Sequence, residues 1–145
     1  MGIFQLNQKY ALHLADLELA QYMGELYPAA KGEGEKIRQY FMSTPNRRAF
    51  GIKCVICTFK DIDCPPSKIA QRIGVSINAV DTMISECESS GWIVVTREDN
   101  NYRRVRASQV LVDQWVNYAT VVADYSVDKD FGGIQSARKY YQAVG

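Results

Sequence analysis

Four arginines that lie close together are the side chains best suited to chemistry. The stretch from residue 97 to residue 106 holds two carboxylates and four guanidinium groups: Glu98 and Asp99 against Arg97, Arg103, Arg104 and Arg106. Guanidinium groups bind phosphate oxygens, and such contacts supply most of the non-specific affinity of proteins for nucleic acids. Successive strand residues point to opposite faces, so we do not expect all four to reach one ligand. In the alternative interpretation, Arg104 and Arg106 pair with nearby carboxylates on an exposed hairpin.

A polar helix face precedes these arginines. In the segment Ile77–Ser89, five polar side chains are spaced to point away from the apolar side: Asn78, Asp81, Thr82, Ser85 and Glu86. An amide can pair bidentately with adenine, so Asn78 suits base readout. The segment carries no lysine or arginine, and Asp81 and Glu86 would repel phosphates. Two interpretations stay open, a DNA-reading surface and a solvated polar face.

Cysteine and histidine chemistry is limited by placement and number. Cys54 and Cys57 lie inside an apolar helical run, and neither Cys64 nor Cys87 has a close partner in sequence, so buried reduced thiols are favoured over a metal site. Cys64, in an expected loop, is the best candidate for a redox-sensing thiol. His13 is the one histidine, which excludes a catalytic or metal site built on several imidazoles. We predict no enzymatic activity, no catalytic residue, no cofactor and no metal, since no phosphate loop or nucleophile elbow is found.

Composition fits one soluble globular domain. The chain has 145 residues, 47% of them hydrophobic and 23% charged, with a net charge of +1. Disordered, collagen-like and disulfide-framework classes are thereby excluded. Positive charge gathers in residues 46–108, while the rest of the chain is slightly acidic. No run approaches eighteen apolar residues and no leader is found, so we expect a cytoplasmic protein with no membrane contact.

The N-terminal part is predicted to be helical. Apolar spacing indicates one helix from about Ala11 to Tyr27, buried on two sides, that Pro28 and nearby glycines end. A short helix follows over residues 35–42. A third helix, over residues 47–60, is expected deep in the core.

The central part carries the most specific pattern. Residues Pro66–Ile73 predict a short helix, Gly74–Ser76 a tight turn, and Ile77–Ser89 a second helix. Gly74 permits a left-handed backbone in the turn, and Ser76 can cap the second helix. Residues 92–96 and 103–107 then predict a two-stranded hairpin with a polar turn. A helix capped by Ser108 runs to about Tyr125, residues 128–133 are irregular, and a short helix covers residues 134–144.

These motifs together resemble the MarR-type winged helix-turn-helix transcriptional regulators. Three segments carry the resemblance: Pro66–Ser76, Glu88–Arg97 and Asn101–Arg106. The resemblance implies a homodimer joined by the N- and C-terminal helices, with a recognition helix in the major groove and a wing arginine, Arg103, at the minor groove. It also implies a small-molecule effector in a crevice between the dimerisation helices and the winged part. Two departures are Asn101, where the family often has aspartate, and a short final helix.

We therefore expect a mainly α fold with a small β-hairpin wing and flanking dimerisation helices. Residues 1–145 form a single domain: an N-terminal dimerisation segment (1–45), a winged helix-turn-helix (46–108) and C-terminal dimerisation helices (109–145). The predicted function is sequence-specific binding of double-stranded DNA, at a palindromic operator, by a homodimeric repressor. The predicted DNA-binding residues are Lys68, Arg72, Ser76, Asn78, Ala79, Thr82, Arg97, Arg103 and Arg104. The alternative is a winged-helix protein-interaction module without an operator.

Overall fold

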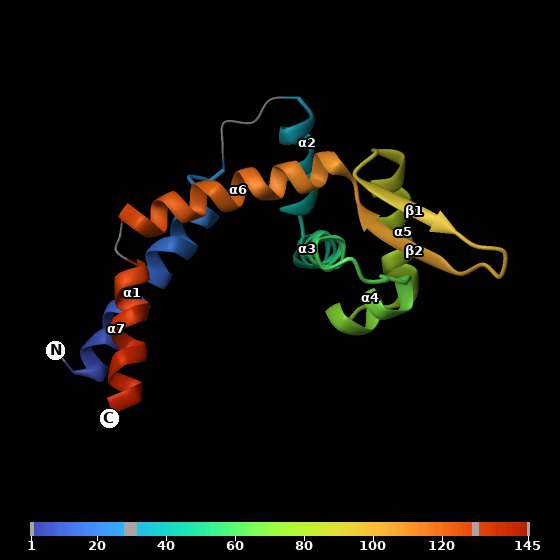
Figure 1. Ribbon diagram of the computed structural model, residues 1–145. Coiled ribbons are helices and arrows are strands. Elements are labelled where there is room, and N and C mark those ends of the chain that lie inside the picture. The colour runs from blue at the N-terminus through green and yellow to red at the C-terminus, as the bar shows by residue number, and fades with distance from the viewer. Residues whose placement is uncertain (1, 28–31, 129–130, 145) are drawn as a thin grey trace. The chain divides into compact units, whose positions relative to one another are not determined.

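The computed structural model describes residues 2–27, 32–128 and 131–144, without the side chains of residues 128 and 131. The described chain is mainly helical and contains one two-stranded antiparallel hairpin (Figure 1), which confirms the predicted fold class. Residues group into two compact units. We call residues 30–116 the winged unit, and residues 1–29 with 117–145 the helical unit. No helix of the described chain is long and apolar enough to cross a membrane.

The winged unit begins with three helices, and local chemistry sets their ends. The short helix α2 (Glu33–Phe41) leads to the central helix α3 (Pro45–Lys60). The Thr44 hydroxyl caps α3 by accepting a hydrogen bond from the Arg47 amide at 3.1 Å. Helix α4 (Pro66–Ile73) starts on a proline, whose missing N–H costs nothing in a first turn.

The helix-turn-helix has the predicted bounds. Gly74 ends α4 with φ of +76°, a left-handed conformation that glycine adopts without strain, as expected. Helix α5 (Ile77–Ser89) begins where the Ser76 hydroxyl accepts from the Ala79 amide at 3.1 Å, so the predicted cap is confirmed.

The hairpin consists of β1 (Ile93–Arg97) and β2 (Arg103–Ala107), paired so that Val95 faces Val105. Asn101 in the turn has φ of +62°, a left-handed conformation that asparagine tolerates better than most residues. On the other edge of β2, the Val105 N–H donates to the Cys64 carbonyl at 3.0 Å, which ties the hairpin to the loop before α4. The wing is therefore anchored on both edges of its second strand.

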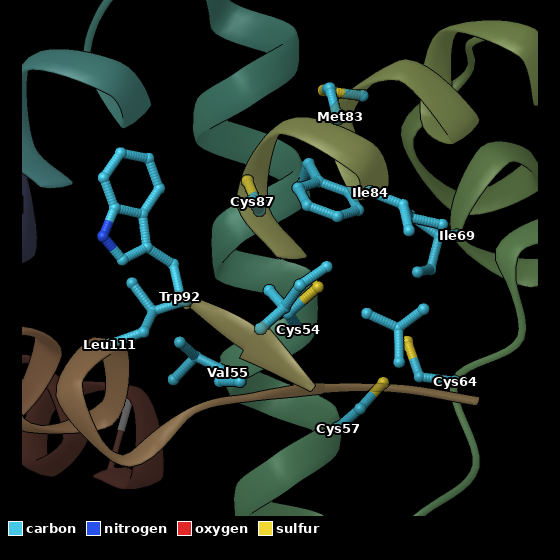
Figure 2. Packing of buried hydrophobic residues seen from close by; sticks show 14 of the residues in the cluster. Cys54, Val55, Cys57, Cys64, Ile69, Met83, Ile84, Cys87, Trp92 and Leu111 are labelled. Atoms are coloured by element: carbon cyan, nitrogen blue, oxygen red, sulfur yellow. The ribbon is translucent and has the colours of Figure 1, made fainter. Parts of the chain in front are cut away.

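The core of the winged unit surrounds α3. Phe50, Ile69, Val80 and Val105 are fully buried, and four cysteine side chains fill the spaces between helices. Figure 2 shows Cys54 and Val55 of α3 on the side that faces the hairpin, with Trp92 close to Leu111. The Trp92 indole N–H donates to the Glu33 carboxylate, which fixes α2 on this core.

Helix α6 (Gln109–Asp128) contributes to both units, with its first eight residues in the winged unit. The predicted cap is wrong, because the buried Ser108 hydroxyl makes no hydrogen bond with the described residues. The backbone N–H of Ser108 donates to the Trp92 carbonyl at 2.9 Å.

The helical unit packs α1 (Ile3–Tyr22) against α7 (Phe131–Val144), as Figure 1 shows. Helix α1 begins eight residues earlier than predicted, because polar residues such as Gln5 also favour helix and apolar spacing does not register them. It ends five residues earlier than predicted. The Gln5 side chain accepts a hydrogen bond from the Gly2 amide at 2.8 Å.

Two further predictions about this unit are wrong. Residues 131–133 are helical rather than irregular, while residues 129–130 lie outside the described chain. Helix α1 is not buried on two sides, since Leu12, Leu19 and Tyr22 are exposed in the single chain. The apolar pattern of a helix indicates which of its faces are suited to burial. It does not show whether residues of the same chain or of another chain bury them.

Candidate nucleic-acid interface

The outward face of α5 presents neutral polar groups. Ser76, Asn78 and Thr82 are exposed and Ala79 is half-buried, whereas Val80 and the apolar residues after it face the core. The Thr82 hydroxyl donates to the backbone carbonyl of Asn78 at 3.1 Å. Four of the predicted site residues thus lie together at the start of this helix.

The two carboxylates of this face are each bound by an arginine. A terminal nitrogen of Arg103 lies 2.8 Å from Asp81 Oδ1, and Arg47 of α3 lies 3.2 Å from Glu86 Oε2. The expected repulsion of phosphates by Asp81 and Glu86 is therefore offset within the protein. Because Asp81 holds Arg103, the predicted wing arginine lies beside the helix and not at the free tip of the hairpin.

Arg97 is held by two parallel hydrogen bonds. Its two terminal nitrogens lie 2.9 Å from the two carboxylate oxygens of Glu88, the last acidic residue of α5. These hydrogen bonds lower the pKa of Glu88 and raise the pKa of Arg97. Paired guanidinium and carboxylate groups of this geometry are specific but, at an exposed site, contribute little to stability.

Arg104 and Arg106 point to the other face of the hairpin, as strand alternation predicts. Arg104 contacts Asp63 at 3.3 Å and Glu98 at 2.9 Å, and these acids raise its pKa. Arg106 contacts Asp61 at 2.7 Å. This is the arrangement of the alternative interpretation, and it separates Arg104 from the face that carries Arg103.

Lys68 and Arg72 extend the candidate surface along α4. Both are exposed, and neither makes an ion pair with another described residue. Lys68 also borders a cavity of about 430 Å³, together with Lys53 of α3 and the loop between α3 and α4. These two side chains are the cations of the predicted set that no carboxylate of the described chain holds.

Sequence reasoning missed three of the acids that bind the hairpin arginines, namely Asp61, Asp63 and Glu88. Asp61 and Asp63 are two residues apart, as are Arg104 and Arg106, and the hydrogen bond from Val105 to Cys64 sets the two segments side by side. A matching period of two between an acidic loop and a basic strand is the signal that could have indicated the pairing. Asp81 was identified as a charge on α5, but its partner depends on how the hairpin folds back.

The cysteines behave as buried apolar groups. All four are free and buried, and among the described residues no group of acids, cysteines and histidine is placed to hold a metal ion. Cys64 is 1% exposed, and burial with a hydrogen bond to Cys57 raises its pKa to about 12. Cys64 thus lacks the exposure and the low pKa that favour a redox-sensing thiol, because its loop is packed under the hairpin.

Comparison with solved structures reveals relatives in fold. A MepR–DNA complex from Staphylococcus aureus has a TM-score of 0.57 and 7% identity over 88% of this chain and 96% of that chain. The transcriptional regulator Tm0710 from Thermotoga maritima has a TM-score of 0.54 and 16% identity over 87% and 89%. The heme sensor PefR from Streptococcus agalactiae, in complex with heme, has a TM-score of 0.51 and 10% identity over 92% and 90%.

These three proteins are MarR-family regulators. The chain has the MarR-like winged-helix fold. The resemblance seen in the sequence is thus confirmed for the fold, and identities this low carry it no further. No protein-family model and no curated protein matches the sequence. In this MarR-like fold, α5 is the element that corresponds to a recognition helix and the β1–β2 hairpin is the wing.

Proposed function

We propose that the protein is a sequence-specific, double-stranded DNA-binding transcriptional regulator that acts as a homodimeric repressor in the cytoplasm. The observation that carries this proposal is the set of exposed neutral side chains at the start of α5, next in the fold to Lys68 and Arg72 of α4, which pair with no carboxylate of the described chain. Asn78 suits the edge of a base, while Lys68 and Arg72 suit phosphates. The likeness in fold to MepR, which was solved with DNA, supports the same use of these elements.

The apolar surface of the helical unit supports the homodimer. Leu12 and Leu19 of α1, with Met23 directly after its last residue, form one exposed stripe where a soluble monomer would normally place polar residues. A second copy would cover this stripe, and its two-fold axis would match a palindromic operator with half-sites about one helical turn apart. A small-molecule effector belongs to the proposal because PefR binds heme, although no residue here is assigned to a ligand.

The first experiment is fluorescence anisotropy of the full chain with random-sequence duplex DNA at about 50 and about 200 mM salt. We expect micromolar binding at the lower salt that weakens by tenfold or more at the higher salt, because phosphate contacts release counterions. Lys68→Ala with Arg72→Ala should weaken binding and flatten its salt dependence. Lys9→Ala with Lys36→Ala removes the same charge from exposed positions on α1 and α2 and serves as the matched control.

The predicted residues have separate expected roles. Asn78→Ala should change the preference among sequences, whereas Arg103→Ala should weaken binding to all sequences alike. Equal losses on specific and random DNA for Asn78→Ala would contradict the base-reading role. Far-ultraviolet circular dichroism of each variant checks that the substitution leaves the fold intact.

One observation favours a second candidate function. Every arginine of the hairpin is bound by a carboxylate, and α5 itself carries acids and no base. A winged-helix module that docks a partner protein through α5 would show these features without an operator. Failure to bind any duplex even at about 50 mM salt would exclude the DNA-binding proposal and leave this one.

A further inference from the structure

Helix α5 lacks the residue types that most often recognise guanine. The commonest specific contact to DNA is an arginine or lysine on the O6 and N7 of guanine, and α5 holds neither residue. The arginines nearest to the helix are occupied, since Arg103 binds Asp81 at 2.8 Å and Arg97 binds both oxygens of Glu88. Base readout from this helix therefore depends on neutral side chains.

One of these neutral side chains is apolar and exposed. Ile77, the first residue of α5, is 43% exposed, whereas Val80, Met83, Ile84 and Cys87 of the same helix are buried. An isoleucine left in water forgoes the free energy that burial would supply. The major-groove edges of DNA carry one apolar group, the 5-methyl of thymine, so Ile77 is matched to that group.

The next residue supplies the complementary polar group. Asn78 is exposed, and its side-chain amide makes no hydrogen bond with another described residue. An amide matches the N6 and N7 of adenine. Both side chains lie in the first turn of α5, and the first residues of a recognition helix are those that contact base edges.

We propose that the first turn of α5 reads adjacent A·T pairs, with Ile77 against a thymine methyl and the Asn78 amide on an adenine. This inference rests on the proposed function and narrows it to operators whose half-site core contains these pairs. The Ile77 contact carries the discrimination between thymine and cytosine, because cytosine lacks the methyl group and presents a donor there.

The test starts with selection of binding sites from a random duplex library by the full chain. In the selected site, each thymine is replaced in turn by deoxyuridine, which removes the 5-methyl and keeps the base pairing. We expect one replacement to weaken binding about fourfold, because burial of one methyl group contributes about that factor to affinity. Ile77→Ala should show the same loss on the thymine site and no further loss on the deoxyuridine site.

Ile62→Ala is the matched control, because Ile62 is also 43% exposed and lies in the loop before α4. It should keep the full sensitivity to deoxyuridine. A selected site with no methyl-sensitive thymine, or a sensitivity that persists in Ile77→Ala, would overturn the inference and leave DNA binding intact. Selection of no sequence, together with no binding to random duplex, would overturn the proposed function and the inference with it.

Discussion

The winged unit and the helical unit bury their apolar residues to different extents. Phe50 and Val105 of the winged unit are 0% exposed and belong to one continuous core. In the described part of the helical unit, Tyr22 is 85% and Val127 is 77% exposed, and few apolar side chains are buried. The winged unit thus completes its core from a single chain. The helical unit carries apolar surface in excess, which is the property expected of an assembly element.

The largest expected effect is on the core of the winged unit. Phe50→Ala should lower the free energy of unfolding by about 3 to 5 kcal/mol, because it leaves a cavity in close-packed surroundings. Phe59→Ala on the same helix is the matched control, since Phe59 is 56% exposed, and its effect should be several-fold smaller. Urea denaturation followed by circular dichroism measures both. Equal losses in the free energy of unfolding would mean that Phe50 is not packed as closely as its burial indicates.

The helical unit should respond in its assembly. Leu12→Glu with Leu19→Glu places charges on the exposed stripe of α1, and we expect dimer dissociation with a monomer that keeps the fold of the winged unit. Each leucine that a partner fully covers is worth about 2 kcal/mol, so the dissociation constant should rise by at least a hundredfold. Sedimentation velocity at several concentrations measures this change.

Val94→Glu is the control for this experiment, because Val94 is an exposed apolar residue of the winged unit. It should leave the oligomeric state unchanged. A wild-type chain that is monomeric at every concentration tested would remove the homodimer from the proposed function.

The same contrast explains which predictions from sequence were correct. The bounds of α4 and α5 followed from residues whose effect is local: a proline in the first turn, Gly74 with its positive φ, and the Ser76 cap. The start of α1 and the burial of its two sides depend on partners outside the segment. Helix α1 has polar residues that any helix accepts, so its pattern alone did not locate its first residue.

In the candidate site, too, local features were predicted from the sequence and tertiary contacts were not. The polar face of α5 follows from helical periodicity and was predicted residue by residue. The pairing of Arg103 with Asp81 joins residues 22 positions apart, and that of Arg104 with Asp63 joins residues 41 positions apart. Such contacts are set by the tertiary path of the hairpin, which a single sequence does not encode in any local spacing.

Alkaline pH should weaken the winged unit through its buried thiols. Burial raises the pKa of both Cys64 and Cys87 from 9.0 to about 12. A raised folded-state pKa gives stability that is complete below the unfolded-state value and is lost as the pH rises between about 9 and about 12. Urea denaturation in reductant should show lower stability at pH 10 than at pH 8. In the double variant Cys64→Ala with Cys87→Ala, the free energy of unfolding should depend less on pH. An unchanged dependence would contradict the thiols as its cause.

The smallest expected effect tests how the charges of the reading surface are balanced. Asp81→Asn releases Arg103 from its 2.8 Å partner, so a guanidinium becomes available for a phosphate. Affinity for random duplex should rise by a few-fold, and the slope of log K against log salt should steepen by about one. Asp113→Asn removes the same charge from an exposed position on α6, where Asp113 accepts a hydrogen bond from Gln109, and should change the affinity little. Equal gains in both variants would indicate that net charge alone acts. If affinity for random duplex rises only in Asp81→Asn, and adding Arg103→Ala cancels the rise, then the acids of α5 restrain non-specific binding. This is consistent with a helix that reads bases through neutral groups.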